Sequence, residues 1–152
     1  MNIVRVLKGA IEDHPILVAY KERAQSDTAV FGATIAAMDA PTSVRQGATI
    51  SFDVGVTNTG NQVWHATPDG PTHVRLGVQL LDRDLKLLDR NYHRESLTAA
   101  IAPGQQGTIR VNCAAPIEVG RYGFKIDLVR ESVAWFETLG SRPAIWKIDV
   151  VE

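Results

Sequence analysis

The sequence predicts an all-β protein, an antiparallel β-sandwich, and two observations support this prediction. From residue 30 onward, apolar and polar residues alternate with a period of two, and turn-forming residues separate the alternating segments at short intervals. A strand with this pattern has one dry face and one wet face, so each sheet must cover its apolar face with another sheet. The spacing leaves room for about seven or eight strands.

The clearest strand is expected at 49–57, where apolar residues occupy the even positions. Its apolar row and four others with the same alternation are Ile50, Phe52, Val54 and Val56; Val74, Leu76, Val78 and Leu80; Ile109, Val111 and Cys113; Tyr122, Phe124, Ile126 and Leu128; and Trp146, Ile148 and Val150. Turn signals separate the rows at 58–61, 68–71, 82–84, 103–104 and 116–120. Cys113 is the only cysteine and lies in an inward row, so we expect it to be a buried core residue.

One tyrosine makes the prediction more specific. Tyr122 follows Gly120 at the start of the strong penultimate strand, where its hydroxyl can bond back to the backbone of the preceding loop. This tyrosine corner is typical of immunoglobulin-like sandwiches. The disulfide of antibody domains is absent, so the predicted likeness is one of architecture.

The first 28 residues differ in kind from the rest. Pro15 suits the first turn of a helix that ends near Gln25, and the apolar residues on one face of this helix are Ile16, Leu17, Tyr20 and Ala24. A helix this short is marginal alone, so its apolar face is expected to dock on the main domain or on another subunit. We therefore divide the chain into a helical extension and linker, 1–28, and a sandwich domain, 29–152.

Composition excludes several classes of partner. The chain has 152 residues, 45% of them hydrophobic, and a formal net charge of -1. This suits one soluble domain and gives no electrostatic reason to expect nucleic acid or an anionic membrane surface. The N-terminus makes a poor secretory signal, and no apolar stretch approaches the ~20 residues of a membrane span. A cytoplasmic location is the simplest expectation.

Catalytic and metal signatures are weak. The sequence has no Gly-x-Ser-x-Gly elbow, no phosphate-binding loop and no dinucleotide fingerprint, so we expect neither enzyme activity nor a cofactor. The segment 82–84, Asp-Arg-Asp, fits a hairpin turn better than a metal site. His65 and His73 bracket a loop that contains Asp69, but their spacing matches no compact zinc pattern.

A carboxylate pair keeps one enzymatic alternative open. Glu131 and Glu137 are candidates for the acid and nucleophile of a glycosidase, although the sequence does not give their separation in space. An enzyme with a loop-borne carboxylate or metal site is therefore a third, weaker hypothesis.

Two predicted strands present polar outer faces that favour ligand binding. Arg75 and Gln79 lie opposite one inward row, and Lys125 and Asp127 lie opposite another. In an immunoglobulin-like topology these strands are neighbours, so their outer faces would merge into one patch of donors and acceptors suited to a sugar. An ordinary wet sheet face is the alternative interpretation.

An aromatic pair lies close to this patch in the sequence. Trp135 and Phe136 are adjacent, so an extended backbone points one inward and leaves the other outside. An exposed Trp135 would supply a platform on which a sugar ring stacks, whereas packing at the end of the sandwich is the structural alternative.

Several motifs resemble a known group of domains. They are Val56-Thr57-Asn58-Thr59-Gly60 with Trp64, Val74-Arg75-Leu76-Gly77, Ile101-Ala102-Pro103-Gly104, Ala115-Pro116 with Gly120-Arg121-Tyr122, and the stretch from Asp127 to Phe136. Over about residues 30–151 the chain resembles bacterial immunoglobulin-like accessory domains of polysaccharide assembly and export. It is similar in particular to the C-terminal carbohydrate-recognition domain of the ATPase subunit of O-antigen ABC transporters.

More distantly, the chain resembles the four-tryptophan domain of autophagy cargo receptors, a protein-interaction module. Trp64 and Trp146 match two positions of that pattern, but this chain has only three tryptophans. It also departs from the transporter subunit, because it contains no ATPase domain.

The resemblance and the outer patch together predict a non-catalytic module that binds a bacterial cell-surface polysaccharide or glycan intermediate. Its expected contacts are Arg75, Gln79, Lys125 and Asp127 for hydroxyls and Trp135 for stacking. The resemblance implies an export or glycosyltransfer partner, as in lipopolysaccharide biosynthesis. The alternative is a protein-interaction or assembly module, such as a homodimer joined through the N-terminal helix and open sheet edges.

Overall fold

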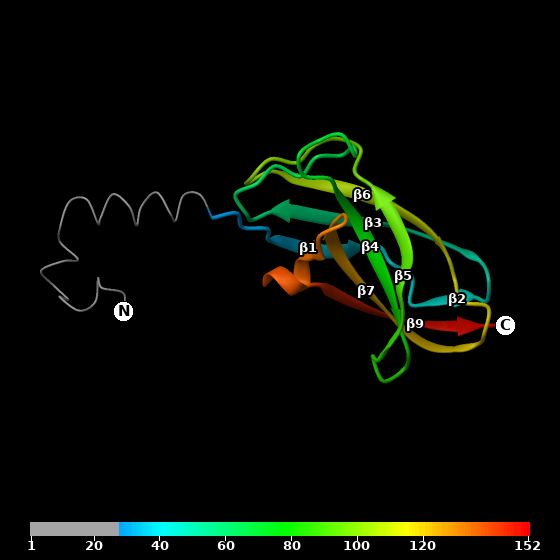
Figure 1. The fold of residues 1–152 in the computed structure, drawn as a ribbon. Helices are drawn as coiled ribbons and strands as arrows, with labels where there is room; N and C mark the ends of the chain where they lie inside the picture. The colour runs from blue at the N-terminus through cyan, green and yellow to red at the C-terminus, as the bar shows by residue number, and fades with distance from the viewer. Residues whose placement is uncertain (1–27) are drawn as a thin grey trace, which may run out of the picture.

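The computed structural model describes residues 28–152, which form two sheets packed face to face (Figure 1). The smaller sheet has the order β1 (Ala33–Met38), β3 (Thr49–Asn58) and β6 (Gln106–Ala114). The larger sheet has the order β2 (Ser43–Arg45), β9 (Ala144–Val151), β7 (Gly120–Arg130), β4 (Val74–Leu81) and β5 (Leu87–Ser96). A two-residue strand, β8 (Ala134–Trp135), pairs with the end of β7 and leads into the 3-10 helix η1 (Phe136–Leu139).

This architecture confirms the predicted all-β sandwich. Apart from the parallel pair β2 and β9, neighbouring strands are antiparallel. Residues 28–152 contain nine strands, because the short β2 and β8 add to the alternating segments seen in the sequence. The predicted helix ending near Gln25 lies outside the described residues, so the domain division at residue 28 stays a prediction.

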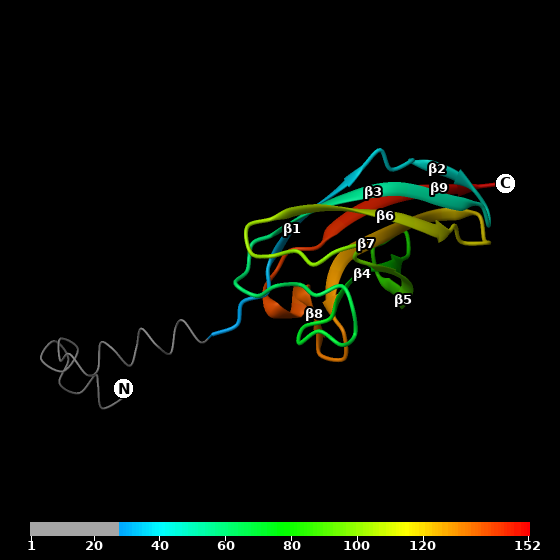
Figure 2. The ribbon, with the colours of Figure 1, turned by 90° about the horizontal axis from the view of Figure 1, so that it is seen from above.

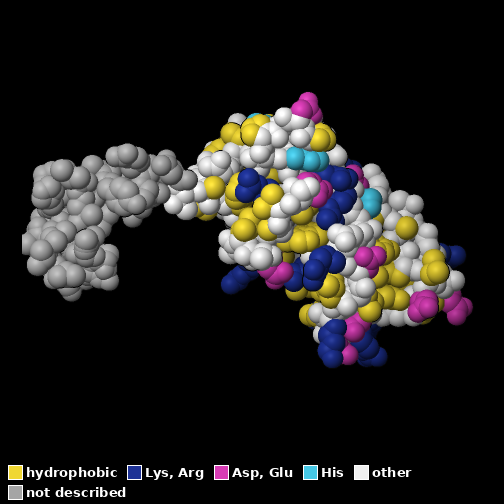
Figure 3. Space-filling model, in the orientation of Figure 1, with side chains coloured by type: hydrophobic (Ala, Val, Ile, Leu, Met, Phe, Trp, Pro, Cys, Tyr) yellow, Lys and Arg dark blue, Asp and Glu magenta, His cyan; other side chains and the backbone are white. Residues whose placement is uncertain are grey.

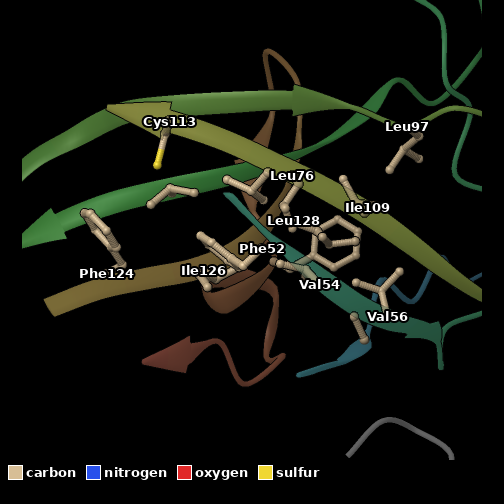
Figure 4. Packing of buried hydrophobic residues seen from close by; sticks show 14 of the residues in the cluster. Phe52, Val54, Val56, Leu76, Leu97, Ile109, Cys113, Phe124, Ile126 and Leu128 are labelled. Atoms are coloured by element: carbon tan, nitrogen blue, oxygen red, sulfur yellow. The ribbon is translucent and has the colours of Figure 1, made fainter. Parts of the chain in front are cut away.

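The core lies between the sheets and consists of the predicted apolar rows. Figure 4 shows Phe52 and Val54 from the smaller sheet meeting Leu76, Ile126 and Leu128 from the larger one. All of these side chains are 0 or 1% exposed. Cys113 is 4% exposed within the same cluster, which confirms its predicted place in the core.

Two predicted turn features are also confirmed. The hydroxyl of Tyr122 donates to the carbonyl of Glu118 at 2.9 Å, which closes the tyrosine corner. Asn58 is fully buried; its side-chain oxygen accepts from the Gly60 amide, and its Nδ2 donates to the carbonyls of Gln62 and Ile101. Buried polar groups that are satisfied in this way hold the turn against the core.

The first strand pairs within its own chain. β1 lies beside β3 in antiparallel register, with Ala33 opposite Asn58. The hydroxyl of Ser141, just before β9, accepts from the Ala33 amide at 3.0 Å and so links the smaller sheet to the larger one. Within residues 28–152, no helix is long and apolar enough to span a bilayer.

Candidate functional site

The outer face of the larger sheet gathers the residues expected to bind a ligand. β4 and β7 are neighbours, as predicted, and Gln79 pairs with Lys125 while Gly77 pairs with Asp127. Arg75 lies on the same face of β4, two residues before Gly77. The face is not simply wet, however, because β8 pairs with the end of β7 and leads into η1 at this end of the sheet (Figure 2), and its Trp135 side chain reaches over Gly77.

Trp135 and Phe136 separate as the extended pair predicts. Phe136 points inward and is 0% exposed, whereas Trp135 is half-buried on the outer side of the sheet. The Trp135 ring lies against Gly77, where an added Cβ would come within 2.4 Å of the indole. The Arg94 guanidinium lies 4.5 Å from the centre of the same ring, a cation–π contact.

Asp127 lies beneath this cover, which corrects its expected place on the surface. It is 0% exposed, and its carboxylate accepts hydrogen bonds from the amides of Leu128 at 2.9 Å and Glu137 at 2.8 Å. Burial raises the pKa of Asp127 to about 6, although the two amides oppose the shift. In this arrangement the carboxylate holds η1 on the sheet and does not face solvent.

Arg75 belongs to a separate ion cluster. Its Nη1 lies 3.3 Å from Glu131, whose carboxylate also lies 3.3 Å from the Nε of Arg94. These contacts anchor the chain that leads into β8. Arg75 does not line the hollow described next, so the structure separates it from Gln79 and Lys125.

A hollow of about 280 Å³ opens on this face beside Trp135, and we call it the Trp135 hollow. Its lining residues are Gln79, Leu81, Leu85, Leu87, Arg90, Lys125, Trp135, Glu137, Thr138 and Ile145. Three residues expected from the sequence therefore meet here. The sequence reasoning missed Arg90 and Leu85 as lining residues, and it considered Glu137 only as a candidate catalytic carboxylate and not as part of this patch.

Gln79 is the most informative residue in the Trp135 hollow. It is 6% exposed, and within residues 28–152 its side-chain amide makes no hydrogen bond. Nearby, the Nζ of Lys125 lies 2.5 Å from Glu137, so that pair is already neutralised. The hollow thus combines apolar walls, a partly exposed ion pair and an amide whose donor and acceptor have no partner among the described residues.

The residues that the sequence offered as alternative metal ligands or catalytic groups are engaged in turns and ion pairs. The carboxylate of Asp82 accepts from the amides of Asp84 and Lys86, the turn role expected of it. Among the residues that the structure describes, no three His, Cys, Asp or Glu side chains are close enough to hold a metal ion. Glu131 and Glu137, the alternative catalytic pair, are each engaged by cationic side chains.

The contact between Gly77 and Trp135 predicts the effect of one added methyl group. In Gly77→Ala, the new Cβ would clash with the indole, so the Trp135 ring must move away from β4. We expect the free energy of unfolding to fall by about 1 to 3 kcal/mol. Urea unfolding and a red shift of tryptophan emission would measure both effects. Gly55→Ala in β3 is the matched control, because its Cβ would meet Met38 at an ordinary 3.5 Å. Equal behaviour of the two variants would show that the indole does not sit on Gly77.

Comparison with known proteins shows which solved structures have a similar fold. No protein-family model matches the sequence, and no curated protein does. Among solved structures, the CARDB domain of the PF1109 protein from Pyrococcus furiosus, crystallised with di-metal ions, aligns with a TM-score of 0.50. The alignment covers 81% of this chain and 94% of that domain at 16% identity. The chain has a CARDB-like immunoglobulin fold.

Carbohydrate-active enzymes contain similar segments. A β-glucosidase from Listeria innocua, solved with glucose, aligns with a TM-score of 0.52 and 12% identity over 80% of this chain. A cycloisomaltooligosaccharide glucanotransferase from Paenibacillus sp., complexed with cycloisomaltoheptaose, aligns with a TM-score of 0.50 and 17% identity over 82% of this chain. The CARDB-like chain spans only 16% and 15% of these enzymes. At such identities, the likeness concerns the fold alone.

Proposed function

We propose that this CARDB-like domain is a non-catalytic carbohydrate-binding module whose Trp135 hollow receives a sugar of a bacterial cell-surface polysaccharide or glycan intermediate. The observation that carries the proposal is the amide of Gln79, which lines the hollow, is reached by solvent and makes no hydrogen bond among the described residues. A hydrogen bond to such a group contributes about 0.5 to 1.5 kcal/mol. A ligand rich in hydroxyls, each a donor and an acceptor, would satisfy it.

The walls of the hollow also suit a sugar. A pyranose presents apolar C–H groups as well as hydroxyls, and Leu81 and Leu87 offer apolar contact on one side. Trp135 supplies an aromatic wall, and the charged ends of Lys125 and Glu137 are ready for charge-assisted hydrogen bonds. In this proposal, Gln79 and Lys125 bind hydroxyls and Trp135 packs on the ring.

In this proposal, Asp127 and Arg75 do not contact the sugar but position residues near the hollow. Asp127 positions η1, and through it Glu137, by accepting the Glu137 amide. Arg75 holds Glu131 and so steadies the connection into β8. Binding rather than catalysis is proposed because Glu131 and Glu137 are both occupied by cations. The export or glycosyltransfer partner and the cytoplasmic location remain predictions.

Titration of the full chain with bacterial polysaccharides by calorimetry tests the proposal through Gln79→Met. This change keeps the length of the side chain but removes its donors and acceptor, so we expect at least about a tenfold loss of affinity. The free energy of unfolding should stay within about 1 kcal/mol of wild type, because the Gln79 amide makes no hydrogen bond among the described residues. A merely structural Gln79 would give the opposite pattern.

Trp135→Ala should also abolish binding, whereas Arg110→Ala is the control. Arg110 pairs with Asp53 on the outer face of the smaller sheet, away from the hollow, so its removal should leave affinity unchanged. The proposal fails if no glycan binds, or if Gln79→Met and wild type bind equally.

The alternative function, assembly through a sheet edge, is favoured by a different feature. Large apolar side chains are exposed near the free edge of β5, with Leu88 55% and Ile117 79% exposed. Leu88 and Ile117 line a hollow of about 390 Å³ together with Tyr92. Exposed apolar surface beside a strand edge suits pairing with a second copy of the chain. Light scattering that finds the full chain monomeric would remove this alternative.

A further inference from the structure

A second hollow, of about 350 Å³, lies on the same outer face of the larger sheet. Its lining includes Arg83, Arg121, Lys147 and Asp149, and we call it the Lys147 hollow. Leu85 lines both this hollow and the Trp135 hollow, so the two are neighbours with Leu85 between them. The side chain of Leu85 folds over Gly123, whose added Cβ would come within 2.9 Å of it.

The strand register shows how the two hollows follow one another. Across β7 and β9, the outer pairs are Arg121 with Asp149, Gly123 with Lys147, and Lys125 with Ile145. Lys125 comes four positions after Arg121, which is about 13 Å along an extended strand. This length exceeds one sugar ring, so the combined site suits an oligosaccharide with units on both sides of Leu85.

The charges in the two hollows are unequal. Both lining carboxylates are already paired, Glu137 with Lys125 at 2.5 Å and Asp149 with the Nε of Arg121 at 3.3 Å. Among the described residues, the remaining lining cations have no ion pair or hydrogen bond: they are Arg83, Arg90 and Lys147. Figure 3 shows Lys and Arg side chains intermixed with Asp and Glu on the visible face and around the hairpin between β4 and β5.

This excess of positive charge is local, because the whole chain has a formal net charge of -1. The hairpin that carries Arg83 and Arg90 also carries the carboxylates of Asp82, Asp84 and Asp89, but none of these three lines either hollow. Asp82 accepts hydrogen bonds from two turn amides and keeps its negative charge. Cations that face a hollow without a partner raise the local concentration of anions.

We infer that the two hollows form one binding face for an acidic polysaccharide, whose sugar carboxylates contact Arg83, Arg90 and Lys147 while its hydroxyls reach Gln79. This inference rests on the proposed function and adds the substrate class. Leu85 adopts a positive φ of 64° in the hairpin turn, and its side chain lines both hollows.

The test titrates the full chain with an oligogalacturonate and with its methyl ester, which has the same sugars without the charge. We expect the acid to bind at least about tenfold more tightly than the ester, and its affinity to fall between about 50 and 200 mM salt. Arg83→Ala/Lys147→Ala and Arg90→Ala should weaken binding of the acid but not of the ester. Arg110→Ala removes one positive charge from the smaller sheet and should change neither the affinity for the acid nor the affinity for the ester.

The outcomes separate this inference from the proposed function. If the ester binds as tightly as the acid and Gln79→Met weakens both, the hollow binds glycans but the acidic class is overturned. No binding of the oligogalacturonate also overturns it. A single-stranded DNA oligonucleotide could bind as tightly as the acid, with an affinity that Gln79→Met does not change. The face would then be an unselective polyanion surface, which contradicts the inference. Loss of glycan binding of every kind would instead end the proposed function itself.

Discussion

Replacing Phe136 with alanine is expected to lower the free energy of unfolding by about 3 to 5 kcal/mol. Phe136 is 0% exposed, and its ring packs edge-on against Trp64 at 5.4 Å and against Phe31 at 5.7 Å between centroids. The truncation leaves a cavity at the end of the sandwich and removes two aromatic contacts. Urea unfolding followed by circular dichroism measures the loss.

The same substitution should affect the outer face. Phe136 anchors η1, and η1 carries Glu137 and follows directly on Trp135. Glycan affinity should therefore fall even at temperatures where Phe136→Ala is still folded. Leu139→Ala is the matched control in the same helix, because Leu139 is 42% exposed and its loss should cost less than about 1 kcal/mol. A Phe136→Ala variant as stable as this control would contradict the packing described.

The second large effect is a pH dependence of stability that originates at Asp127. The folded pKa of Asp127 is about 6, above the ordinary value of 3.8, and burial is the largest cause. The stability that this group contributes is therefore fully present below about pH 3.8 and is lost as the pH rises through about 6. At pH 7.5 the ionised carboxylate costs on the order of 3 kcal/mol relative to its protonated form.

A comparison with Asp127→Asn isolates this contribution. Other titrating groups cancel in the difference between the two proteins, although the charges of Glu137 and Lys125 still act on Asp127. We expect the stability of wild type relative to Asp127→Asn to fall by about 2 to 3 kcal/mol from about pH 4 to pH 7.5. Urea unfolding across this range measures it. A constant difference would mean that the carboxylate is solvated and does not hold η1 from within.

The core and the turns could be read from the sequence because their signals are local. Alternate residues of a strand face opposite sides, so Phe52, Val54 and Ile126 were placed in the core from their positions alone. Tyr122 and Asp82 bond to backbone only a few residues away, so their roles follow from the chemistry of short segments.

The candidate site could be predicted from the sequence only in part. The adjacency of Gln79 and Lys125 followed from expected strand order, and the structure contains that pair. The burial of Asp127 did not follow, because it depends on β8 and η1 returning over the sheet. Arg90 and Leu85 were missed for a related reason: they reach the hollow from a neighbouring strand and a hairpin, which alternation along one strand does not connect.

Periodicity thus established which side chains point into the sandwich and which point out, since that choice is made by backbone geometry within each strand. What covers the outward side chains was decided only when distant segments packed together. The Phe136 ring is buried in the core at the start of η1. With Phe136 held there, Trp135 lies over Gly77 and the Glu137 amide donates to Asp127. The free energy of these contacts comes from burial and hydrogen bonding between residues of different elements, as far apart in the chain as Gly77 and Trp135, so the alternation within one strand does not predict it.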